Sequence, residues 1–300
     1  MNELHICYTI DKDYYHMCLM SIYHLIAHKN EGTKLIIYIL SSDDFCHAFH
    51  NRFNSIKNVE VRDITIPSEF EPKLNRINEL QKFSKAMYSR WIIPKIWLFQ
   101  KVNRVLYVDA DTFAMKDLTS LYNTDLEGKA LGLCKSQYRI LYEYRTKDTF
   151  DKFDPFVNEG VMLMDCAKLN ELNATEMMFE ELMWAYPFVT DEMIVTQNLL
   201  NETKFLPPTA NLLYPVLLEK YPYIDDIFYW NALNNTNYKS FEDLLRKTEV
   251  IHMFGKKINL RTDPKLSKIY SKLYENFMTF LYTETIDTNT KELDNEILSI

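Results

Sequence analysis

Seven short runs of apolar and β-branched residues recur along the chain, and stretches with helix-like apolar spacing lie between them. This alternation is typical of an α/β fold, in which helices layer a central sheet. The expected strands are Leu4–Thr9, Lys34–Leu40, Val59–Ile66, Arg104–Val108, Ala130–Cys134, Gly160–Met164 and Glu249–Phe254. The expected helices are Tyr15–Ala27, Asp43–Ser55, Leu80–Leu98 and Asp191–Leu200.

Two regions fall outside this pattern. Leu212–Ser240 is rich in aromatic residues, Asn and Pro, and we expect it to form an irregular excursion. Lys265–Tyr282 is expected to form a terminal helix, and the polar, acidic segment Glu284–Ile300 is expected to fray after it. Only five glycines occur in the 300 residues, and no Gly/Ser-rich linker divides the chain.

The overall composition limits the classes of partner and compartment. The net charge of -8 argues against nucleic acid as the main partner, because phosphate binding requires a basic face. Five cysteines without a C-x-x-C pair indicate free thiols in a reducing compartment. No basic-then-apolar signal peptide opens the chain, and no run approaches the roughly 20 apolar residues of a transmembrane segment. These features predict a cytoplasmic protein without a transmembrane segment.

One acidic motif directly follows a strand that is apolar enough to be buried. Arg104–Val108 is followed at once by Asp109, Ala110, Asp111 and Thr112. Residues i and i+2 of an extended backbone point the same way, so the two carboxylates can converge on one point. Two carboxylates this close repel unless a cation lies between them, and a hard divalent ion is the natural occupant. The pattern also fits a haloacid-dehalogenase-like phosphatase, in which Asp109 would be the nucleophile.

The stretch Val105–Thr112, followed by Asp117–Leu121, resembles a segment of glycosyltransferase family 8, which contains glycogenin and bacterial lipopolysaccharide galactosyl- and glucosyltransferases. The resemblance extends from about Leu4 to Gly255. It implies a GT-A fold, whose Rossmann-like mixed sheet is mainly parallel and flanked by helices. It also implies a retaining glycosyltransferase that moves a hexose from a UDP-sugar to a hydroxyl acceptor on a glycan, a lipid-linked molecule or a protein. The implied cofactor is Mn²⁺, with Mg²⁺ as the alternative.

By the same resemblance, Cys7–Tyr14 matches the segment with which the family binds uridine. Thr9 and Asp11 would contact the uridine, and Tyr14 would stack on the base. Such contacts suit a pyrimidine, which offers a flat face to an aromatic ring and an N–H group to a carboxylate. The resemblance also places Asp109 and Ala110 against the nucleotide.

Two further segments resemble the family's donor-sugar site. Met87–Arg90 matches a Tyr-x-Arg element, which implies that Arg90 bridges the metal-binding acids and the sugar through its fork of donors. Val157–Met164 matches an Asn-x-Gly-Val strand, which implies that Asn158 hydrogen-bonds a sugar hydroxyl where Gly160 permits close approach of the backbone.

Thr190–Met193 resembles the family's Asp-Gln element beside the reacting carbon, and it contributes the catalytic candidates Asp191 and Glu192. Asp191 also suits a helix N-cap. Glu192 stands where the family usually has Gln. A carboxylate near the anomeric carbon could stabilise oxocarbenium charge or act as a nucleophile, so a covalent intermediate and a front-face route both stay open.

Val250–Gly255 resembles the family's His-x-x-Gly-x-x-Lys ending, in which the His completes the metal site. The implied metal ligands are therefore Asp109, Asp111 and His252, a set of two carboxylates and one imidazole that suits manganese.

The same ending implies that Gly255 and a lysine lie at the donor phosphates. The family's lysine position holds Ile258 here, so we assign the phosphate role to the neighbouring Lys257. A second departure concerns the donor sugar. Lys135 and Ser136 stand where several relatives have an Asp that contacts the sugar, so the identity of the sugar stays open.

The resemblance implies a catalytic domain over residues 1–262 and a C-terminal helix with an acidic tail over residues 263–300. Within the domain, residues 1–112 would bind the nucleotide, and residues 113–262 would bind the acceptor and complete the metal site. A homodimer stays open. Two alternatives remain: the phosphatase, for which Asp225 and Asp226 would be the second acidic pair, and a GT-A module that binds a nucleotide sugar without turnover.

Overall fold

The computed structural model describes residues 2–42, 48–81, 83–136, 156–185, 190–213, 227–253 and 264–283. Its strands are β1 (Asn2–Thr9), β2 (Thr33–Ser41), β3 (Val59–Thr65), β4 (Arg104–Val108), β5 (Thr112–Ala114), β6 (Leu131–Lys135), β7 (Val157–Asp165), β8 (Thr203–Leu206), β9 (Leu212–Leu213) and β10 (Val250–His252). Its α-helices are α1 (Tyr15–His28), α2 (Ala48–Asn54), α3 (Glu71–Gln81), α4 (Lys85–Ser89), α5 (Trp97–Val102), α6 (Thr119–Tyr122), α8 (Cys166–Glu171), α9 (Ala174–Trp184), α10 (Asp191–Asn198), α12 (Ile227–Asn234), α13 (Phe241–Lys247) and α15 (Pro264–Thr283). Short 3₁₀ helices are η1 (Arg90–Lys95), η3 (Leu200–Glu202) and η4 (Pro208–Ala210).

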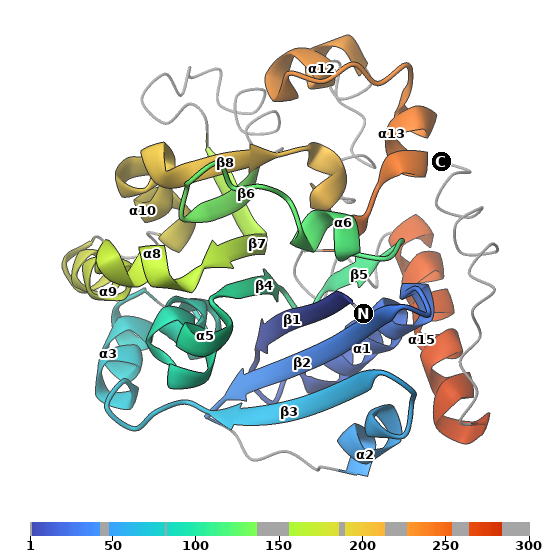
Figure 1. The fold of residues 1–300 in the computed structure, drawn as a ribbon, viewed down its shortest axis with the longest axis horizontal. Coiled ribbons are helices and arrows are strands. Elements are labelled where there is room, and N and C mark those ends of the chain that lie inside the picture. Colours follow the sequence, from blue (N-terminus) through green and yellow to red (C-terminus); the bar gives the residue numbers. More distant parts are fainter. Residues whose placement is uncertain are drawn as a thin grey trace.

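Seven strands form the main sheet in the order β3-β2-β1-β4-β7-β6-β8 (Figure 1). Neighbouring strands are parallel except where β7 pairs antiparallel with β4 and β6. The sheet is therefore mixed and mainly parallel, as predicted. Strand β1 pairs with β4 through Ile6 and Cys7, opposite Leu106 and Tyr107, so the two strands end at the same edge of the sheet.

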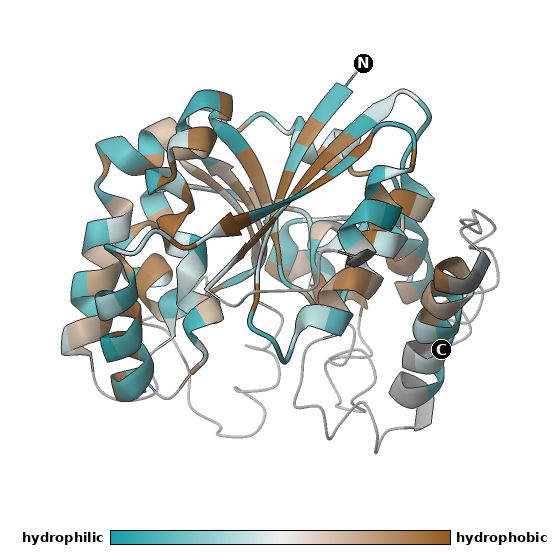
Figure 2. Cartoon of the chain, turned by 90° about the horizontal axis from the view of Figure 1, so that it is seen from below, coloured by the Kyte–Doolittle hydropathy of each residue, from teal (hydrophilic) through white to brown (hydrophobic). Residues whose placement is uncertain are grey.

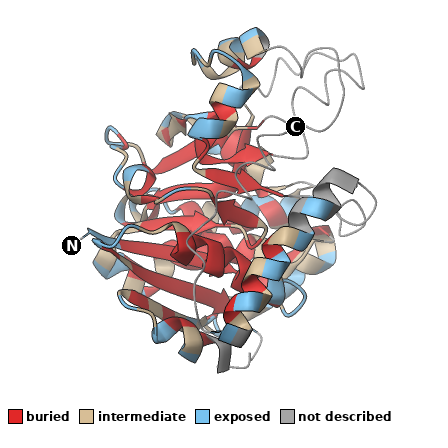
Figure 3. Ribbon diagram, turned by 90° about the vertical axis from the view of Figure 1, so that its right-hand side faces the viewer, coloured by how far each residue is buried: buried red, intermediate tan, exposed pale blue. Residues whose placement is uncertain are grey.

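The central strands β2 and β4 are apolar and buried at most positions because both faces of the sheet are covered by helices. Along β2, Leu35, Ile37 and Ile39 pack into the same cluster as α1 and α15. The alternate residues Ile36 and Tyr38 pack into a second cluster, which contains residues of α3, η1, α5, α8, α9 and α10. Figure 2 shows helices on both sides of the strands, and Figure 3 shows the strands almost wholly buried.

A second, three-stranded sheet brings distant parts of the chain together, in the order β5-β10-β9. Strand β5 starts directly after the acidic motif and runs antiparallel to β10, with Thr112 opposite His252. Strand β9 pairs with the other edge of β10. This pairing places His252 beside the acids that end β4, although more than a hundred residues separate them in the sequence.

The predicted helix Leu80–Leu98 is wrong as a single element. Helix α3 ends at Gln81, and Ser84 then accepts a hydrogen bond from the backbone N–H of Ala86, so it caps a new helix, α4. From Arg90 the chain tightens into the 3₁₀ helix η1, which contains Pro94. A proline removes one helical N–H and clashes with the preceding turn, so a continuous α-helix is excluded here.

Other expectations have mixed outcomes. The terminal helix is confirmed as α15, and the region 212–240 is wrong in part, because residues 227–234 form α12. The predictions missed α3, α6, α8, α9, α13 and the strands β5, β8 and β9. Four cysteines are free and buried, and Cys46 and the tail 284–300 lie outside the described residues. Within the described ranges, none of the helices combines the length and apolar composition needed to cross a bilayer.

We expect Phe280→Ala to lower the free energy of unfolding by about 3 kcal/mol or more, because a large aromatic side chain leaves a cavity when it is removed from a core. Phe280 is 1% exposed, and its ring lies 5.4 Å from the rings of both Tyr23 and Phe53. Urea unfolding followed by circular dichroism measures the change. Tyr274→Ala on the same helix is the control, because Tyr274 is 45% exposed and its loss should change stability little. Equal losses in the two variants would contradict the packing of α15.

Candidate functional site

The two acids of the motif leave β4 in a turn that backbone hydrogen bonds hold on both sides. The N–H of Asp109 donates to the carbonyl of Gly160 on β7 at 2.8 Å, and the carbonyl of Asp109 accepts from the hydroxyl of Thr112 at 2.7 Å. The carbonyl of Asp111 accepts from the N–H of Met253 at 2.9 Å. The turn is therefore fixed to both sheets at once.

The imidazole of His252 meets these acids. Its Nε2 lies 3.2 Å from Asp111 Oδ1 and 3.9 Å from Asp109 Oδ2. One ligand atom from each of the three residues lies within 4.8 Å of the others, and in the part of the chain that the structure describes this is the one such His/Cys/Asp/Glu cluster. Two carboxylates and one imidazole nitrogen fit a divalent cation of the manganese type. The three predicted ligands thus lie together.

The electrostatics of the cluster agree with this geometry. Burial alone would raise the pKa of Asp111, but the adjacent His252 lowers it below its ordinary value. Burial alone would lower the pKa of His252, but Asp111 and then Asp109 raise it. Each charge is stabilised by the other, so a cation entering the cluster would replace a proton on the imidazole.

Two residues behind the cluster orient the imidazole. Asn211 is fully buried, and its Oδ1 lies 3.1 Å from His252 Nδ1. An N–H at Nδ1 donating to this oxygen leaves the lone pair of Nε2 directed at the acids. Gly160 makes room for the ring, since a Cβ at this position would lie 2.2 Å from His252 Cε1. Sequence reasoning missed Asn211, because an isolated Asn after a Pro-Pro pair has no distinguishing pattern.

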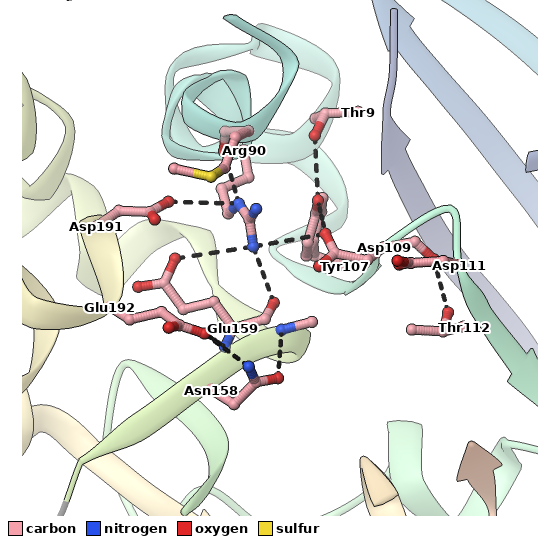
Figure 4. Close-up of polar contacts among 12 residues, drawn as sticks. Thr9, Arg90, Tyr107, Asp109, Asp111, Thr112, Asn158, Glu159, Asp191 and Glu192 are labelled. Atoms are coloured by element: carbon pink, nitrogen blue, oxygen red, sulfur yellow. Dashed lines mark hydrogen bonds and ion pairs between the residues drawn. The ribbon is translucent and has the colours of Figure 1, made fainter. Parts of the chain in front are cut away.

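Arg90 lies at the centre of a buried group of acids (Figure 4). Its guanidinium contacts Asp109 at 3.5 Å through Nη1 and Asp191 at 3.5 Å through Nε. It also lies over the ring of Tyr107, 4.8 Å from the ring centre, and Tyr107 donates a hydrogen bond to Asp109. Burial opposes the charge of the guanidinium, but the surrounding carboxylates raise the pKa of Arg90 well above its ordinary value.

Glu159 belongs to the same group and was not predicted. Its Oε2 lies 3.9 Å from Arg90 Nη1, and its backbone carbonyl accepts from Arg90 at 3.2 Å. The indole N–H of Trp91 points between Glu159 and Asp191, at 3.3 and 3.2 Å from their oxygens. One buried acid in an apolar strand gives no periodic signal in a sequence, so no pattern could have found it.

Asn158 and Glu192 are joined directly. Asn158 is buried inside β7, which starts earlier than the predicted strand Gly160–Met164. The Nδ2 of Asn158 donates a hydrogen bond to Glu192 Oε1 at 2.6 Å. Its Oδ1 accepts from Asn211 Nδ2 at 2.6 Å, which connects Glu192 to the residue behind His252. Burial, and then the charge of Asp191, raises the pKa of Glu192 to about 7.

Asp191 occupies the first turn of α10, but the N-cap predicted for it is wrong. Thr190 is the N-cap residue, and the carboxylate of Asp191 is turned into the protein towards Arg90 and Trp91. The ion pair with Arg90 competes with capping for the same oxygens, and inside a buried site the ion pair is the stronger of the two interactions.

A pocket of about 250 Å³ lies beside this group, at the carboxyl ends of β1 and β4. Tyr14 is 37% exposed at its mouth, and Thr9 hydrogen-bonds Tyr107 at 3.2 Å. Asp11 accepts from Ser84 at 2.6 Å and from the N–H groups of its own turn, so its carboxylate is held in place. The lining residues are Thr9, Ile10, Asp11, Tyr14, Phe83, Ser84, Ala86, Met87, Arg90, Tyr107, Asp109, Ala110 and Asp111.

Two of the predicted phosphate-site residues cannot be placed, and the lysine at the departure in β6 contacts α12. Gly255 and Lys257 lie outside the described residues. Lys135 donates to the carbonyl of Leu233 at the end of α12, at 2.7 Å, and lies over the ring of Phe205.

Comparisons with known proteins identify the family of the chain. Residues 5–257 match the family described as "Glycosyl transferase family 8". Over 226 residues the chain is 25% identical to the lipopolysaccharide 1,2-glucosyltransferase of Escherichia coli (strain K12), covering 72% of this chain and 64% of that protein. Over 183 residues it is 23% identical to the probable galacturonosyltransferase-like 4 of Arabidopsis thaliana, covering 56% of this chain and 51% of that protein. The chain thus spans less than two thirds of these relatives.

Solved structures show the same fold. The galactosyltransferase LgtC, in complex with donor and acceptor sugar analogs, has a TM-score of 0.64 at 15% identity, over 97% of this chain and all of that chain. The glycosyltransferase GlyE of Streptococcus pneumoniae TIGR4 has a TM-score of 0.63 at 16% identity, over all of this chain and 64% of that chain. The predicted GT-A fold is confirmed. Because the match extends from the first strand to beyond the last one, the chain belongs to glycosyl transferase family 8.

Proposed function

We propose that this chain is a retaining hexosyltransferase, which moves a hexose from a UDP-sugar to a hydroxyl acceptor on a glycan, a lipid-linked molecule or a protein. The observation that carries the proposal is the convergence of Asp109, Asp111 and His252 beside a pocket lined by Thr9, Asp11 and Tyr14. Membership of the family and its glycosyltransferase relatives support it.

Asp109, Asp111 and His252 would hold Mn²⁺, with Mg²⁺ as the alternative. The cation would stabilise the negative charge that develops on the departing diphosphate. The protein's own contribution is to hold the three ligands in place: the backbone of Gly160 fixes Asp109, and Asn211 fixes the imidazole. Gly255 and Lys257 remain our candidates at the diphosphate.

The uridine would occupy the pocket between the ends of β1 and β4. Tyr14 would stack on the base, and Thr9, Asp11 and Ala110 would line the nucleotide. The hydrogen bond from Ser84 to Asp11 supports this assignment. A carboxylate whose orientation is fixed in the free protein loses little conformational entropy when it binds a ligand N–H group.

Four residues would act at the sugar. Arg90 would neutralise charge between the cation and the sugar, and Asn158 would hydrogen-bond a hydroxyl. Asp191 and Glu192 would lie beside the anomeric carbon, where either carboxylate could stabilise oxocarbenium charge or form a covalent intermediate. Retention follows if the acceptor hydroxyl attacks from the face that the diphosphate leaves.

The division of labour between the two parts of the chain is also a proposal. Residues 1–112 would bind the nucleotide, residues 113–262 would complete the metal site and bind the acceptor, and residues 263–300 would follow the catalytic domain. The relatives include a lipopolysaccharide glucosyltransferase and a probable galacturonosyltransferase-like protein, so the donor sugar is best found with a panel of UDP-sugars.

Among the alternatives, the phosphatase is less well supported. The chain belongs to a glycosyltransferase family, and the acids that follow β4 face an imidazole. The second acidic pair proposed for the phosphatase, Asp225 and Asp226, lies outside the described residues. A GT-A module that binds a nucleotide sugar without turnover would share every contact described above. Turnover of a UDP-sugar separates it from the enzyme.

Asp111→Asn should abolish Mn²⁺-dependent UDP binding and turnover, because the amide supplies one weak neutral ligand in place of a carboxylate. Calorimetry with UDP in Mn²⁺, Mg²⁺ or EDTA measures binding, and hydrolysis of a panel of UDP-sugars measures turnover. Asp125→Asn, at an exposed position, is the control and should behave like the wild type. Wild-type binding by Asp111→Asn would disprove the site.

Asn211→Leu should weaken Mn²⁺ binding by about tenfold to a hundredfold, because the imidazole loses the acceptor that fixes its orientation. Asn211→Asp keeps that acceptor and should stay closer to the wild type. Titration of Mn²⁺ followed by electron paramagnetic resonance gives the affinities. If both variants bind Mn²⁺ like the wild type, Asn211 has no role in orienting His252.

A further inference from the structure

The side chain of Glu159 is fully buried, and the proposed function gives it no task. It projects from β7 towards η1 and α10 and does not line the nucleotide pocket. A buried carboxylate without a clear partner is costly, so its surroundings indicate in which form it is held.

The charges around Glu159 do not balance if every acid is ionised. Arg90 is the cation at the centre, and Asp109, Asp191 and Glu159 lie within 3.5, 3.5 and 3.9 Å of its nitrogens. A metal ion bound in the proposed site would balance the negative charge of Asp109. Asp191 and Glu159 then share one guanidinium, and Glu192 of α10 adds a further acid on the same side.

The contacts of the two acids show which carboxylate lacks hydrogen-bond donors. Asp191 Oδ2 accepts a hydrogen bond from Trp91 Nε1 at 3.2 Å, and it lies in an ion pair 3.5 Å from Arg90 Nε. Glu159 Oε2 competes for the same indole N–H at 3.3 Å, and within the described residues Oε1 of Glu159 is buried without any hydrogen-bond partner. Two carboxylates that meet at one N–H are mutually repulsive unless a proton lies between them.

We propose that Glu159 is a neutral carboxylic acid at pH 7 and donates its proton to Asp191, and that it thereby acts as a positioning residue for Asp191 and Arg90. Asp191 keeps its negative charge and its ion pair, and the guanidinium remains extended towards Asp109. Burial, and then the charge of Asp191, raises the pKa of Glu159 well above its ordinary value, which agrees with this assignment. The positioning role of Glu159 rests on the proposed function, whereas its protonation does not depend on that function.

The proton makes the site sensitive to alkaline pH. Its loss would place a second full charge beside Arg90 and draw the guanidinium from Asp109 towards Glu159. The groups that face Glu159 are Arg90 of η1 and Asp191 and Glu192 of α10. Tyr88 of α4 in turn faces Asp191, and burial raises the pKa of its hydroxyl.

The first test compares the stability of the wild type with Glu159→Gln as a function of pH. An acid whose pKa is raised by folding has its full stability below the unfolded value of 4.5 and loses stability as pH rises towards the folded value. The ratio of the unfolding constants, wild type over variant, should therefore increase about tenfold per pH unit above pH 4.5. Glu171→Gln, at an exposed position, should show a constant ratio. A constant ratio for Glu159→Gln would overturn the proposal.

The second test is infrared spectroscopy of the folded protein at pH 8. We expect the carbonyl stretch of a protonated carboxylic acid in the wild type and its absence in Glu159→Gln. The variant Glu192→Gln should keep the band, which excludes Glu192, whose pKa is also raised, as its source. If Glu159→Gln does not fold, the test still stands: absence of the band at pH 8 from both the wild type and Glu192→Gln would disprove that Glu159 is protonated.

The third test concerns the positioning role. Glu159→Gln retains a donor at the same place and should keep kcat within about threefold of the wild type, whereas Glu159→Leu should lose at least tenfold in kcat with little change in KM for the donor. Equal losses in the two variants would contradict positioning through the proton. No turnover by any of the proteins, with the infrared band present, would disprove the proposed function and leave the proton standing.

Discussion

The burial of one guanidinium among acids from three elements is the interaction on which the site depends. Arg90 starts the 3₁₀ helix η1, and it draws together Asp109 at the end of β4, Glu159 on β7 and Asp191 on α10. A buried charge without partners costs several kcal/mol, and removing one partner of a buried pair typically costs about 3–5 kcal/mol. The position of α10 against the sheet and the position of the acidic motif are therefore energetically linked.

The topology of the sheet explains why this cluster has a pocket beside it. Strands β2 and β3 lie on one side of β1 and β4 lies on the other, so the strand order reverses between β1 and β4. In open α/β sheets a crevice forms outside the carboxyl ends of the strands at such a point. Thr9 ends β1, and Asp109 follows β4, so these two strands place polar residues at the carboxyl edge of the sheet, where they line the pocket.

Much of the site could be predicted because its residues follow strands or match the motifs of a family. Asp109 and Asp111 lie close together as expected, although they occupy a turn and not the extended backbone from which the expectation was drawn. The antiparallel pairing of β5 with β10 brings His252 to them. Glu159 and Asn211 were missed because each is a single polar residue whose partners are set only by tertiary packing. The long helix over residues 80–98 failed because its apolar spacing continues across Ser84 and Pro94, which interrupt the backbone hydrogen bonds. Periodicity reports which side of a segment is buried, and it does not report where the helical hydrogen bonds stop.

The contact between Gly160 and His252 has a consequence for how this chain could change over generations. The ring occupies the space where any larger residue at 160 would place its first side-chain carbon, 2.2 Å from Cε1. A substitution of the glycine is tolerable only after the ring at 252 has been replaced, whereas the reverse order displaces a ring that the cluster needs. The two positions are thus expected to be epistatic, with a fixed order of permitted substitutions. Alanine or serine at the position of Gly160 is expected first in members of the family that have lost the imidazole.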